Sequence, residues 1–492
     1  MRCNCTVGGK ARGSSMSARH LAIDIGASSG RHIVGEVVDG KMQLTEVYRF
    51  ENKLVQKNGH LCWDIDALFQ NVLAGLAAAR EQGLTPDTIG IDTWAVDFVL
   101  LDADGNRLGD AVGYRDSRTD GVREELERNR VLSFAEQYAR TGIQYQKFNT
   151  AYQLYALKRE HPEQLAAADK FLMIPDYLNY LLTGVAANEY TNASTTALVN
   201  AESLTWDNEL ISRLGLPRRI FQTMRMPGSA LGKFSASVAE QVGYSATVIL
   251  PATHDTGSAW LAVPARDDQA VYLSSGTWSL VGTENLAAIT TPASAAANFT
   301  NEGGYDRRFR YLKNIMGLWM IQNVRRELSE RYGEAPSWGK LVEEAEAARA
   351  AGFAAQVDVD DPQFLAPESM VEQIRSCCAQ TGQPVPQTDG QVALVVYDSL
   401  AADYARAVRD LEALTGKLYT SINIVGGGSN NQYLNQATAN ACGLPVFAGP
   451  TEGTALGNLM VQFIQAGEYA DLAAARAAIK QSFEIKEVLP SC

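Results

Sequence analysis

Histidine and cysteine are scarce in this chain, and their scarcity excludes several kinds of site. The 492 residues include five histidines and seven cysteines. Cys3 and Cys5, like Cys377 and Cys378, stand too close together for an ordinary pair of zinc ligands, so we expect no zinc site. An odd number of cysteines spread over a long chain does not form a disulfide framework. We therefore expect reduced thiols and a cytoplasmic protein.

Long apolar runs and an excess of positive charge are also missing. No stretch approaches the roughly 18 consecutive apolar residues of a membrane span, and the segment before Ser17 lacks the apolar core of a signal peptide. The formal net charge of -13 leaves no basic stripe for a nucleic-acid backbone. We expect neither a membrane nor a nucleic acid as partner. Residues 1–18 are expected to form a disordered extension, with Met16 as an alternative start.

The most familiar phosphate-binding motifs are absent as well. Gly8-Gly-Lys10 is followed by Ala11, so there is no P-loop, and the catalytic set of the protein kinases does not occur. A dinucleotide-binding glycine loop must lead into a helix, whereas β-branched, strand-like residues follow Gly30. A nucleotide would therefore have to be held by backbone amides, a few arginines and a divalent cation.

What remains is the composition of a large globular protein. Apolar residues make up 46% of the chain, enough for sizeable cores, and the length predicts roughly two to four domains. Apolar runs at 21–25, 33–38 and 42–50, separated by tight turns, predict three antiparallel strands, and a strand-turn-strand pattern returns at 270–282, which predicts a duplicated domain. Further strands are expected at 89–101, 247–251 and 421–425, and helices at 65–79, 120–138, 152–160, 174–182, 341–351 and 394–414.

Two of the expected hairpin loops have the composition of phosphate-binding turns. Asp24–Arg31 and Ser274–Trp278 each place glycine and hydroxyl residues between apolar strands, where backbone N–H groups can surround a phosphate. Either loop alone is more often an ordinary hairpin, but one in each half of the chain predicts a phosphate clamp. Asp24 is predicted to face a cavity and a hydrated metal ion. The alternative is a carboxylate that caps the turn.

Asp255 is the candidate proton acceptor. It follows an apolar strand and stands between His254 and Thr256. It could instead be an N-cap for the helical segment 257–261, and both roles are compatible because a helix N-terminus would keep the carboxylate ionised.

A third glycine loop, at 426–428, follows a buried-type strand. It leads into a helical pattern that Ser429 or Asn430 is predicted to cap. A strand, glycine loop and helix in this order could bring backbone amides against a nucleotide.

Nine segments together resemble the FGGY carbohydrate kinases, over nearly the whole chain from Ala22 to Gln462. The segments are Thr93–Phe98, Gly113–Arg118, Ile174–Leu178, Glu189–Ser194, Thr253–Thr256, Ser274–Ser279, Asn301–Gly304, Lys313–Trp319 and Val425–Gly428. The resemblance implies an α/β fold of two actin-like, ribonuclease H-like ATPase domains with an interdomain cleft. It implies an N-terminal domain at 19–260, which holds the sugar and the first phosphate loop, and a C-terminal nucleotide-binding domain at 261–485.

The resemblance also implies roles for individual residues. Those implied for ATP are Ala27, Ser28, Ser29, Gly30, Arg31, Thr277, Gln322 and Gly427. Those implied for the sugar are Ala95, His254, Asp255, Thr256 and Asn314, with Asp255 as proton acceptor. The implied activity is transfer of a phosphoryl group from ATP, with Mg²⁺, to a hydroxyl group of a small sugar.

The chain departs from the family pattern at two positions. The family usually has glycine in place of Ala95, and the added methyl group would narrow the sugar pocket or shift a backbone contact. Thr438 stands where a disulfide partner of Cys442 is found in some members, so no disulfide is expected. Two alternatives stay open: a kinase of the same family with another sugar or polyol as substrate, and a sugar- and ATP-binding sensor without phosphotransferase activity. The sequence does not predict an oligomeric state.

Overall fold

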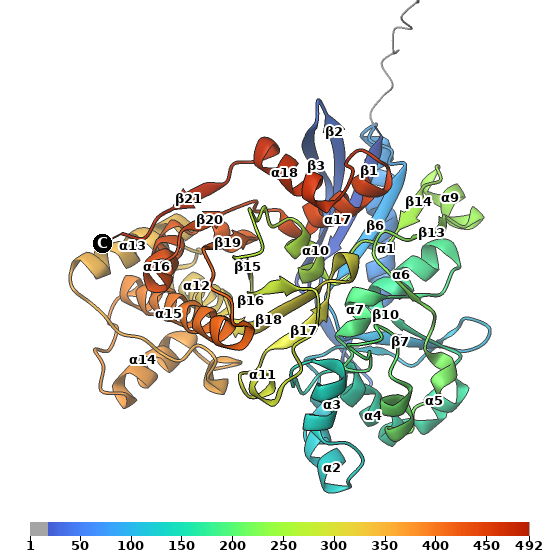
Figure 1. Cartoon of the computed structure of the whole chain (residues 1–492), viewed down its shortest axis with the longest axis horizontal. Helices are drawn as coiled ribbons and strands as arrows, with labels where there is room; N and C mark the ends of the chain where they lie inside the picture. The colour runs from blue at the N-terminus through green and yellow to red at the C-terminus, as the bar shows by residue number, and fades with distance from the viewer. Residues whose placement is uncertain (1–17, 492) are drawn as a thin grey trace, which may run out of the picture.

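The computed structural model describes residues 18–491, which form two halves, each built around its own β-sheet (Figure 1). The predicted extension at 1–18 lies outside the described residues except for Ala18. Within 18–491, no helix is both long and apolar enough to cross a membrane.

The first sheet has six strands in the order β13-β14-β6-β1-β2-β3. The central strand β1 pairs antiparallel with β2 and parallel with β6, as expected for a hairpin next to a crossover. The three antiparallel strands predicted at the start of the chain are confirmed. The bounds are β1 (Arg19–Ile25), β2 (Ser29–Val38), β3 (Lys41–Glu51), β6 (Thr88–Thr93), β13 (Ala230–Lys233) and β14 (Thr247–Ile249).

The second sheet has seven strands in the order β17-β18-β16-β15-β19-β20-β21 and repeats the pairing of the first. Its central strand β15 pairs antiparallel with β16 and parallel with β19, so β15 takes the place of β1. This repetition agrees with the predicted duplication. The bounds are β15 (Ala270–Ser275), β16 (Trp278–Asn285), β17 (Thr300–Gly303), β18 (Phe309–Met316), β19 (Ser421–Val425), β20 (Val446–Ala448) and β21 (Lys486–Val488).

Helices and short strands cover the two sheets. The helices that follow the early strands are α1 (Ile65–Glu81), α2 (Val122–Arg128), α3 (Phe134–Thr141), α4 (Thr150–Glu160), α5 (Pro162–Ala167), α6 (Ile174–Thr183), α7 (Tyr190–Ser194), α8 (Asn208–Arg213) and α9 (Ala236–Val242). The later helices are α10 (Asp255–Leu261), α11 (Pro292–Ala296), α12 (Trp319–Tyr332), α13 (Trp338–Ala350), α14 (Met370–Gln380), α15 (Asp389–Thr415), α16 (Gln432–Cys442), α17 (Gly453–Gln465) and α18 (Leu472–Ser482). The short strands are β4 (Leu54–Lys57), β5 (His60–Trp63), β7 (Phe98–Leu101), β8 (Arg107–Leu108), β9 (Ala111–Val112), β10 (Lys170–Met173), β11 (Asn188–Glu189) and β12 (Met224–Arg225).

The single helix predicted at 120–138 is wrong, because two helices, α2 and α3, occupy this region. Arg130 has a positive φ of 53°, a conformation that cannot continue an α-helix. Ser133 then begins α3 with a capping box, in which Ser133 and Glu136 satisfy each other's backbone N–H groups. The apolar periodicity runs through both helices and conceals the break. The predicted cap of α16 is also wrong by one residue, since Asn431 caps it.

Helix α17 joins the two halves. It is the red helix between the blue strands of the first sheet and helix α10 in Figure 1. The amide of Asn458 donates to the carbonyl of Gly90 at 3.0 Å and to the carboxyl group of Asp92 at 2.6 Å. Next to it, a Cβ at Gly457 would lie 1.8 Å from the carbonyl oxygen of Ser258 in α10. The C-terminal part of the chain therefore fixes α10, the helix that begins at Asp255, against the first sheet.

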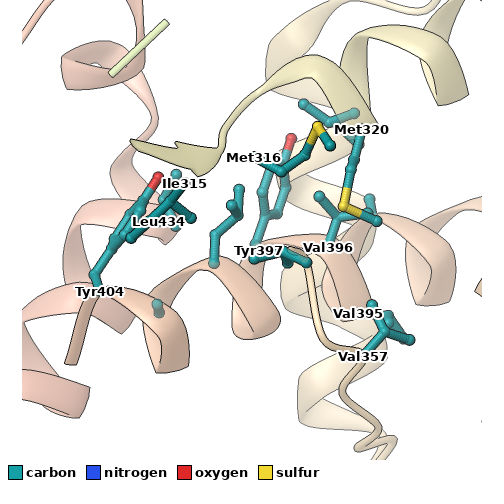
Figure 2. Packing of buried hydrophobic residues seen from close by; sticks show 14 of the residues in the cluster. Ile315, Met316, Met320, Val357, Val395, Val396, Tyr397, Tyr404 and Leu434 are labelled. Atoms are coloured by element: carbon teal, nitrogen blue, oxygen red, sulfur yellow. The ribbon is translucent and has the colours of Figure 1, made fainter. Parts of the chain in front are cut away.

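The largest core lies beneath the second sheet and supports the start of α12. Figure 2 shows Met316 at the end of β18 and Met320 at the start of α12 packed near Tyr397 of the buried helix α15. The hydroxyl groups of Tyr404 and Ser279 lie 2.6 Å apart, which ties α15 to β16. Because these side chains are buried, the loop between β18 and α12 has a fixed position next to the turn between β15 and β16.

Candidate functional site

A cavity of about 540 Å³ lies between the two halves. Its wall is built from loops that follow β1, β6 and β14 in the first sheet and β15 and β19 in the second. These strands are parallel within each sheet, so their carboxyl ends, and the loops after them, meet at one edge. The backbone bridge between Thr93 and His254 continues this alignment beyond the strands.

Most of the residues singled out from the sequence line this cavity. They are Ala27, Ser28, Arg31, Ala95, His254, Asp255, Thr256, Thr277, Asn314, Gln322 and Gly427. Asp24, which was predicted to face a cavity, does not belong to the lining, and neither do Ser29 and Gly30 at the start of β2. A Cβ at Gly30 would lie 2.2 Å from the ring of Phe50, so this glycine is needed for packing against Phe50.

The first loop is a tight turn held by Asn52. The N–H of Gly26 donates to the carbonyl of Ser29 at 2.8 Å and closes the turn. Asn52 donates its side-chain amide to the carbonyl of Gly26 at 2.9 Å and its backbone N–H to the carbonyl of Ser28 at 3.0 Å. The carbonyl groups of Gly26, Ser28 and Ser29 thereby have hydrogen-bond donors within the protein, as expected of a loop that presents amides to an anion.

Asp24 and Arg31 form an ion pair beside this turn. The Nε and Nη2 atoms of Arg31 lie 3.0 and 2.9 Å from Oδ2 of Asp24, and Nη1 contacts the carboxylate of Glu452 in front of α17. Asp92 lies beside Asp24, on the neighbouring strand β6. Burial together with the charge of Asp24 raises the pKa of Asp92 well above its ordinary value. Within residues 18–491, no group of three or more His, Cys, Asp or Glu side chains is placed to hold a metal ion.

The second loop is fixed to α12. The backbone N–H groups of Leu318 and Trp319 donate to the carbonyls of Gly276 and Thr277 at 2.9 and 3.2 Å. The hydroxyl of Thr277 donates to Oε1 of Gln322 at 3.3 Å. Thr277 and Gln322, which the resemblance assigns to the nucleotide, therefore lie in direct contact.

Asp255 occupies the first helical position of α10, and His254 is the N-cap, so the predicted N-cap role of Asp255 is wrong. The predicted ionised form of Asp255 does not come from a lowered pKa. Burial is the largest influence and raises the pKa of Asp255 to about 6, while nearby His254 and the N–H of Thr256, which donates at 2.6 Å, oppose the rise. Such a carboxylate is ionised at neutral pH and is a stronger base than an exposed aspartate.

His254 is oriented by a buried ion pair that sequence analysis missed. Nη2 of Arg310 lies 2.9 Å from Nδ1 of His254 and 2.9 Å from Oε2 of Glu302. A guanidinium group can only donate, so Nδ1 of His254 accepts from Arg310 in the tautomer that carries its proton on Nε2, which lies 3.0 Å from the hydroxyl of Thr256 and 3.5 Å from Asp255. Nδ1 also lies 3.3 Å from Oε2 of Glu302. Glu302 belongs to one of the family-like segments, whereas Arg310 lies in an ordinary strand pattern and carries no sequence signal of its own.

Ala95 lies in a loop that the hydrogen bonds of Asp97 hold in place. The indole nitrogens of Trp63 and Trp94 donate to Oδ2 of Asp97 at 2.6 and 3.0 Å, and the amide of Gln153 donates to Oδ1 at 3.0 Å. Burial raises the pKa of Asp97 to about 6 against these hydrogen bonds. Val96, which also lines the cavity, has a φ of +67°, a conformation in which a β-branched residue is strained.

Comparison with solved structures shows the fold. A xylulose kinase from Lactobacillus acidophilus aligns over 96% of this chain and 94% of its own, with a TM-score of 0.78 at 19% identity. A glycerol kinase from Plasmodium falciparum, solved with ADP, aligns over 96% and 95% with a TM-score of 0.75 at 14% identity. The predicted α/β fold of two actin-like domains with a cleft between them is thereby confirmed.

Comparison of sequences shows the family. The rhamnulokinase of Halalkalibacterium halodurans is 52% identical over 95% of this chain and 97% of its own, and that of Bacillus subtilis is 44% identical over 96% and 95%. Residues 20–262 match the N-terminal domain of the FGGY family of carbohydrate kinases, and residues 271–466 match its C-terminal domain. Matches that cover both walls of the cavity and nearly the whole chain show that this protein belongs to the FGGY family of carbohydrate kinases.

Proposed function

We propose that this chain uses ATP to phosphorylate L-rhamnulose at its C1 hydroxyl, giving L-rhamnulose 1-phosphate and ADP in L-rhamnose catabolism. The observation that carries the proposal is the presence of Asp255 in the same cavity as both phosphate-loop candidates. Relatives 44–52% identical over nearly their whole length are named rhamnulokinases, which supports this sugar.

Asp255 is proposed as the general base. Its carboxylate would accept the proton of the attacking hydroxyl, and the sugar would also contact Ala95, His254, Thr256 and Asn314, which all line the cavity. Proton removal by a placed carboxylate contributes about 10²–10⁴ in rate. In phosphoryl transfer the remaining acceleration comes mainly from positioning and from stabilisation of charge on the transferred group.

ATP is proposed to lie between the two loops. Ala27, Ser28 and Arg31 would hold its phosphates from one side and Thr277 from the other, with Gln322 and Gly427 next to the nucleotide. Ser29 and Gly30 remain part of the proposed phosphate loop through the turn that they complete.

Asp24 is proposed as the protein ligand of Mg²⁺, through water. Mg²⁺ is usually bound by one or two carboxylates together with substrate phosphates and water, so the chain needs no cluster of ligands to hold it. Asp24 is a carboxylate next to the phosphate loop, but its Oδ2 is paired with Arg31 and it does not line the cavity, so it would reach the ion only through water. When bound, the ion would neutralise charge on the phosphate oxygens.

Residues 19–260 and 261–485 are proposed as two domains that close on the substrates. Closure would exclude water, which competes with the sugar as phosphoryl acceptor. Arg115 already bridges the cavity, because its guanidinium lies 5.3 Å from the ring of Tyr114 in the first half and 5.4 Å from the ring of Trp319 in the second.

The test is an ADP-release assay with purified protein, ATP and Mg²⁺ over a panel of L-rhamnulose, L-fuculose, D-xylulose and glycerol. We expect ADP release to depend on the sugar, with the highest kcat/KM for L-rhamnulose and the phosphate on C1 of the product. A clear preference for another member of the panel would refute the proposed substrate and support a sister kinase. ATP binding without any sugar-dependent ADP release would support the sensor.

A further inference from the structure

Gln144 is a buried glutamine on the cavity wall whose side-chain amide finds no hydrogen-bond partner in the part of the chain that the structure describes. It follows α3, lines the cavity together with Ala95 and Asp255, and is only 2% exposed. Neither Oε1 nor Nε2 finds a hydrogen-bond partner within residues 18–491. Nearly all buried polar groups in proteins are paired, so an amide with both ends free requires an explanation.

The segment that carries Gln144 is fixed to the second half of the molecule. The N–H of Gln144 donates to Oγ1 of Thr300 at 3.2 Å. Two residues earlier, the carbonyl of Gly142 accepts the backbone N–H of Asn301 at 2.8 Å and its side-chain amide at 3.0 Å. The backbone position of Gln144 is thereby set before any ligand binds, and the free amide is not the result of an unanchored loop.

Two neighbouring buried glutamines show the usual situation. The amide of Gln153 donates to the carbonyls of Val96 and Phe148 and to Asp97, and its Oε1 accepts from Arg118 at 2.7 Å. Gln137 likewise donates to a carbonyl at 3.2 Å and accepts from a tyrosine hydroxyl at 2.7 Å. Both glutamines hold the protein together, whereas Gln144 lines the cavity and its buried amide has no partner within residues 18–491.

We propose that Gln144 recognises the sugar. A primary amide presents one donor and one acceptor side by side, and each hydroxyl of a ketose can both donate and accept. Nε2 of Gln144 would donate to one hydroxyl and Oε1 would accept from another, at carbons other than the one that is phosphorylated, because that hydroxyl is directed to Asp255. Gln144 is then a specificity-determining residue that orients the ketose. This inference rests on the proposed function.

The test compares Gln144→Leu with the matched control Gln153→Leu. Because the side-chain amide of Gln144 has no hydrogen-bond partner within residues 18–491, we expect Gln144→Leu to leave the melting temperature of the unliganded protein unchanged or higher. Its KM for the sugar should rise about 10- to 100-fold, the range expected when sugar hydroxyls lose their partners, while the Kd for ATP changes less than about threefold. Gln153→Leu should lower the melting temperature. A parental sugar KM in Gln144→Leu would overturn the inference, and so would a loss of stability as large as that of the control.

Deoxy analogues of the accepted sugar test the contact itself. The parental protein should bind the analogue that lacks a recognised hydroxyl about 10- to 100-fold more weakly, and Gln144→Leu should bind that analogue and the full sugar about equally. If removal of each hydroxyl weakens binding as much in Gln144→Leu as in the parental protein, the contact is refuted. The assay uses whichever sugar of the panel releases ADP, so a preference for a sugar other than L-rhamnulose refutes the proposed substrate while Gln144 is still tested. If no sugar releases ADP, ketose binding is followed by thermal shift, and absence of binding refutes the role of Gln144.

Discussion

Replacement of Asp255 by asparagine distinguishes the effect on catalysis from the effect on folding, because we expect kcat to fall and the stability of the fold to rise. The substitution keeps the size of the side chain and the acceptor for the N–H of Thr256 but removes the charge. We expect kcat to fall by about 10²–10⁴, the usual contribution of a general base. The Kd for ATP should stay within about threefold, since the nucleotide is proposed to contact other residues.

The stability of the variant follows from the pKa of Asp255. Burial raises this pKa from 3.8 to about 6, so the folded protein holds the proton more tightly than the unfolded chain does. The folded state is therefore weakened as the pH rises from 3.8 to about 6, and above pH 6 the full cost of the buried charge is present. A rise of this size corresponds to at most about 3 kcal/mol, and the true cost is smaller because the side chain is 26% exposed. Asp255→Asn should then be more stable at pH 7.5, with a melting temperature higher by about 1–3 °C.

Two measurements check this prediction. ADP release at saturating sugar gives kcat, and a thermal melt at pH 7.5 and at pH 5 gives the stability difference, which should shrink at the lower pH. In the parental protein, kcat/KM should fall about tenfold per pH unit below pH 6, whereas the small residual activity of Asp255→Asn should lack this limb. Asp255→Glu serves as control, since it keeps an ionisable carboxylate and should retain the acid limb. A parental rate in Asp255→Asn, or a lower melting temperature at pH 7.5, would refute the reasoning.

Three further predictions follow from single contacts. Thr277→Val should raise the Kd for ATP about 3- to 10-fold and leave sugar affinity unchanged in separate titrations of the two ligands; equal effects on both ligands would contradict the assignment. Arg310→Met leaves the buried charge of Glu302 without its partner and should lower the free energy of unfolding in urea by about 3–5 kcal/mol, whereas an unchanged transition would show that the ion pair is dispensable. Gly457→Ala brings a methyl group against the carbonyl of Ser258 and should cost about 1–3 kcal/mol and reduce kcat, because α10 carries Asp255, the proposed general base; parental stability and rate would refute this close contact.

Local sequence patterns predicted the sheets better than the helices. The strands β1 to β3 and the hairpin of β15 and β16 were found because tight turns separate short apolar runs in both regions. The break between α2 and α3 was missed, because the apolar period continues across it and the break depends on one residue with positive φ. Helix α17 was not predicted either, although it joins the two halves through Asn458.

For the site, the sequence identified residues but not their surroundings. Gly30 was expected to make room for a phosphate, and the structure shows it packed against Phe50, a neighbour that only strand pairing reveals. Arg310 gave no signal, because a charged residue in a strand is usually exposed, and its burial depends on how two distant segments meet.

The sequence by itself determined the composition of the phosphate loops, the order of the strands around them and the resemblance to a family of carbohydrate kinases, since each of these depends on residues close together in the chain. The tertiary structure decided which loops share one cavity, that the pKa of Asp255 is raised and that the amide of Gln144 has no partner among residues 18–491. Burial and hydrogen-bond satisfaction are set by atoms from remote segments, and for that reason they appear only when the chain is folded.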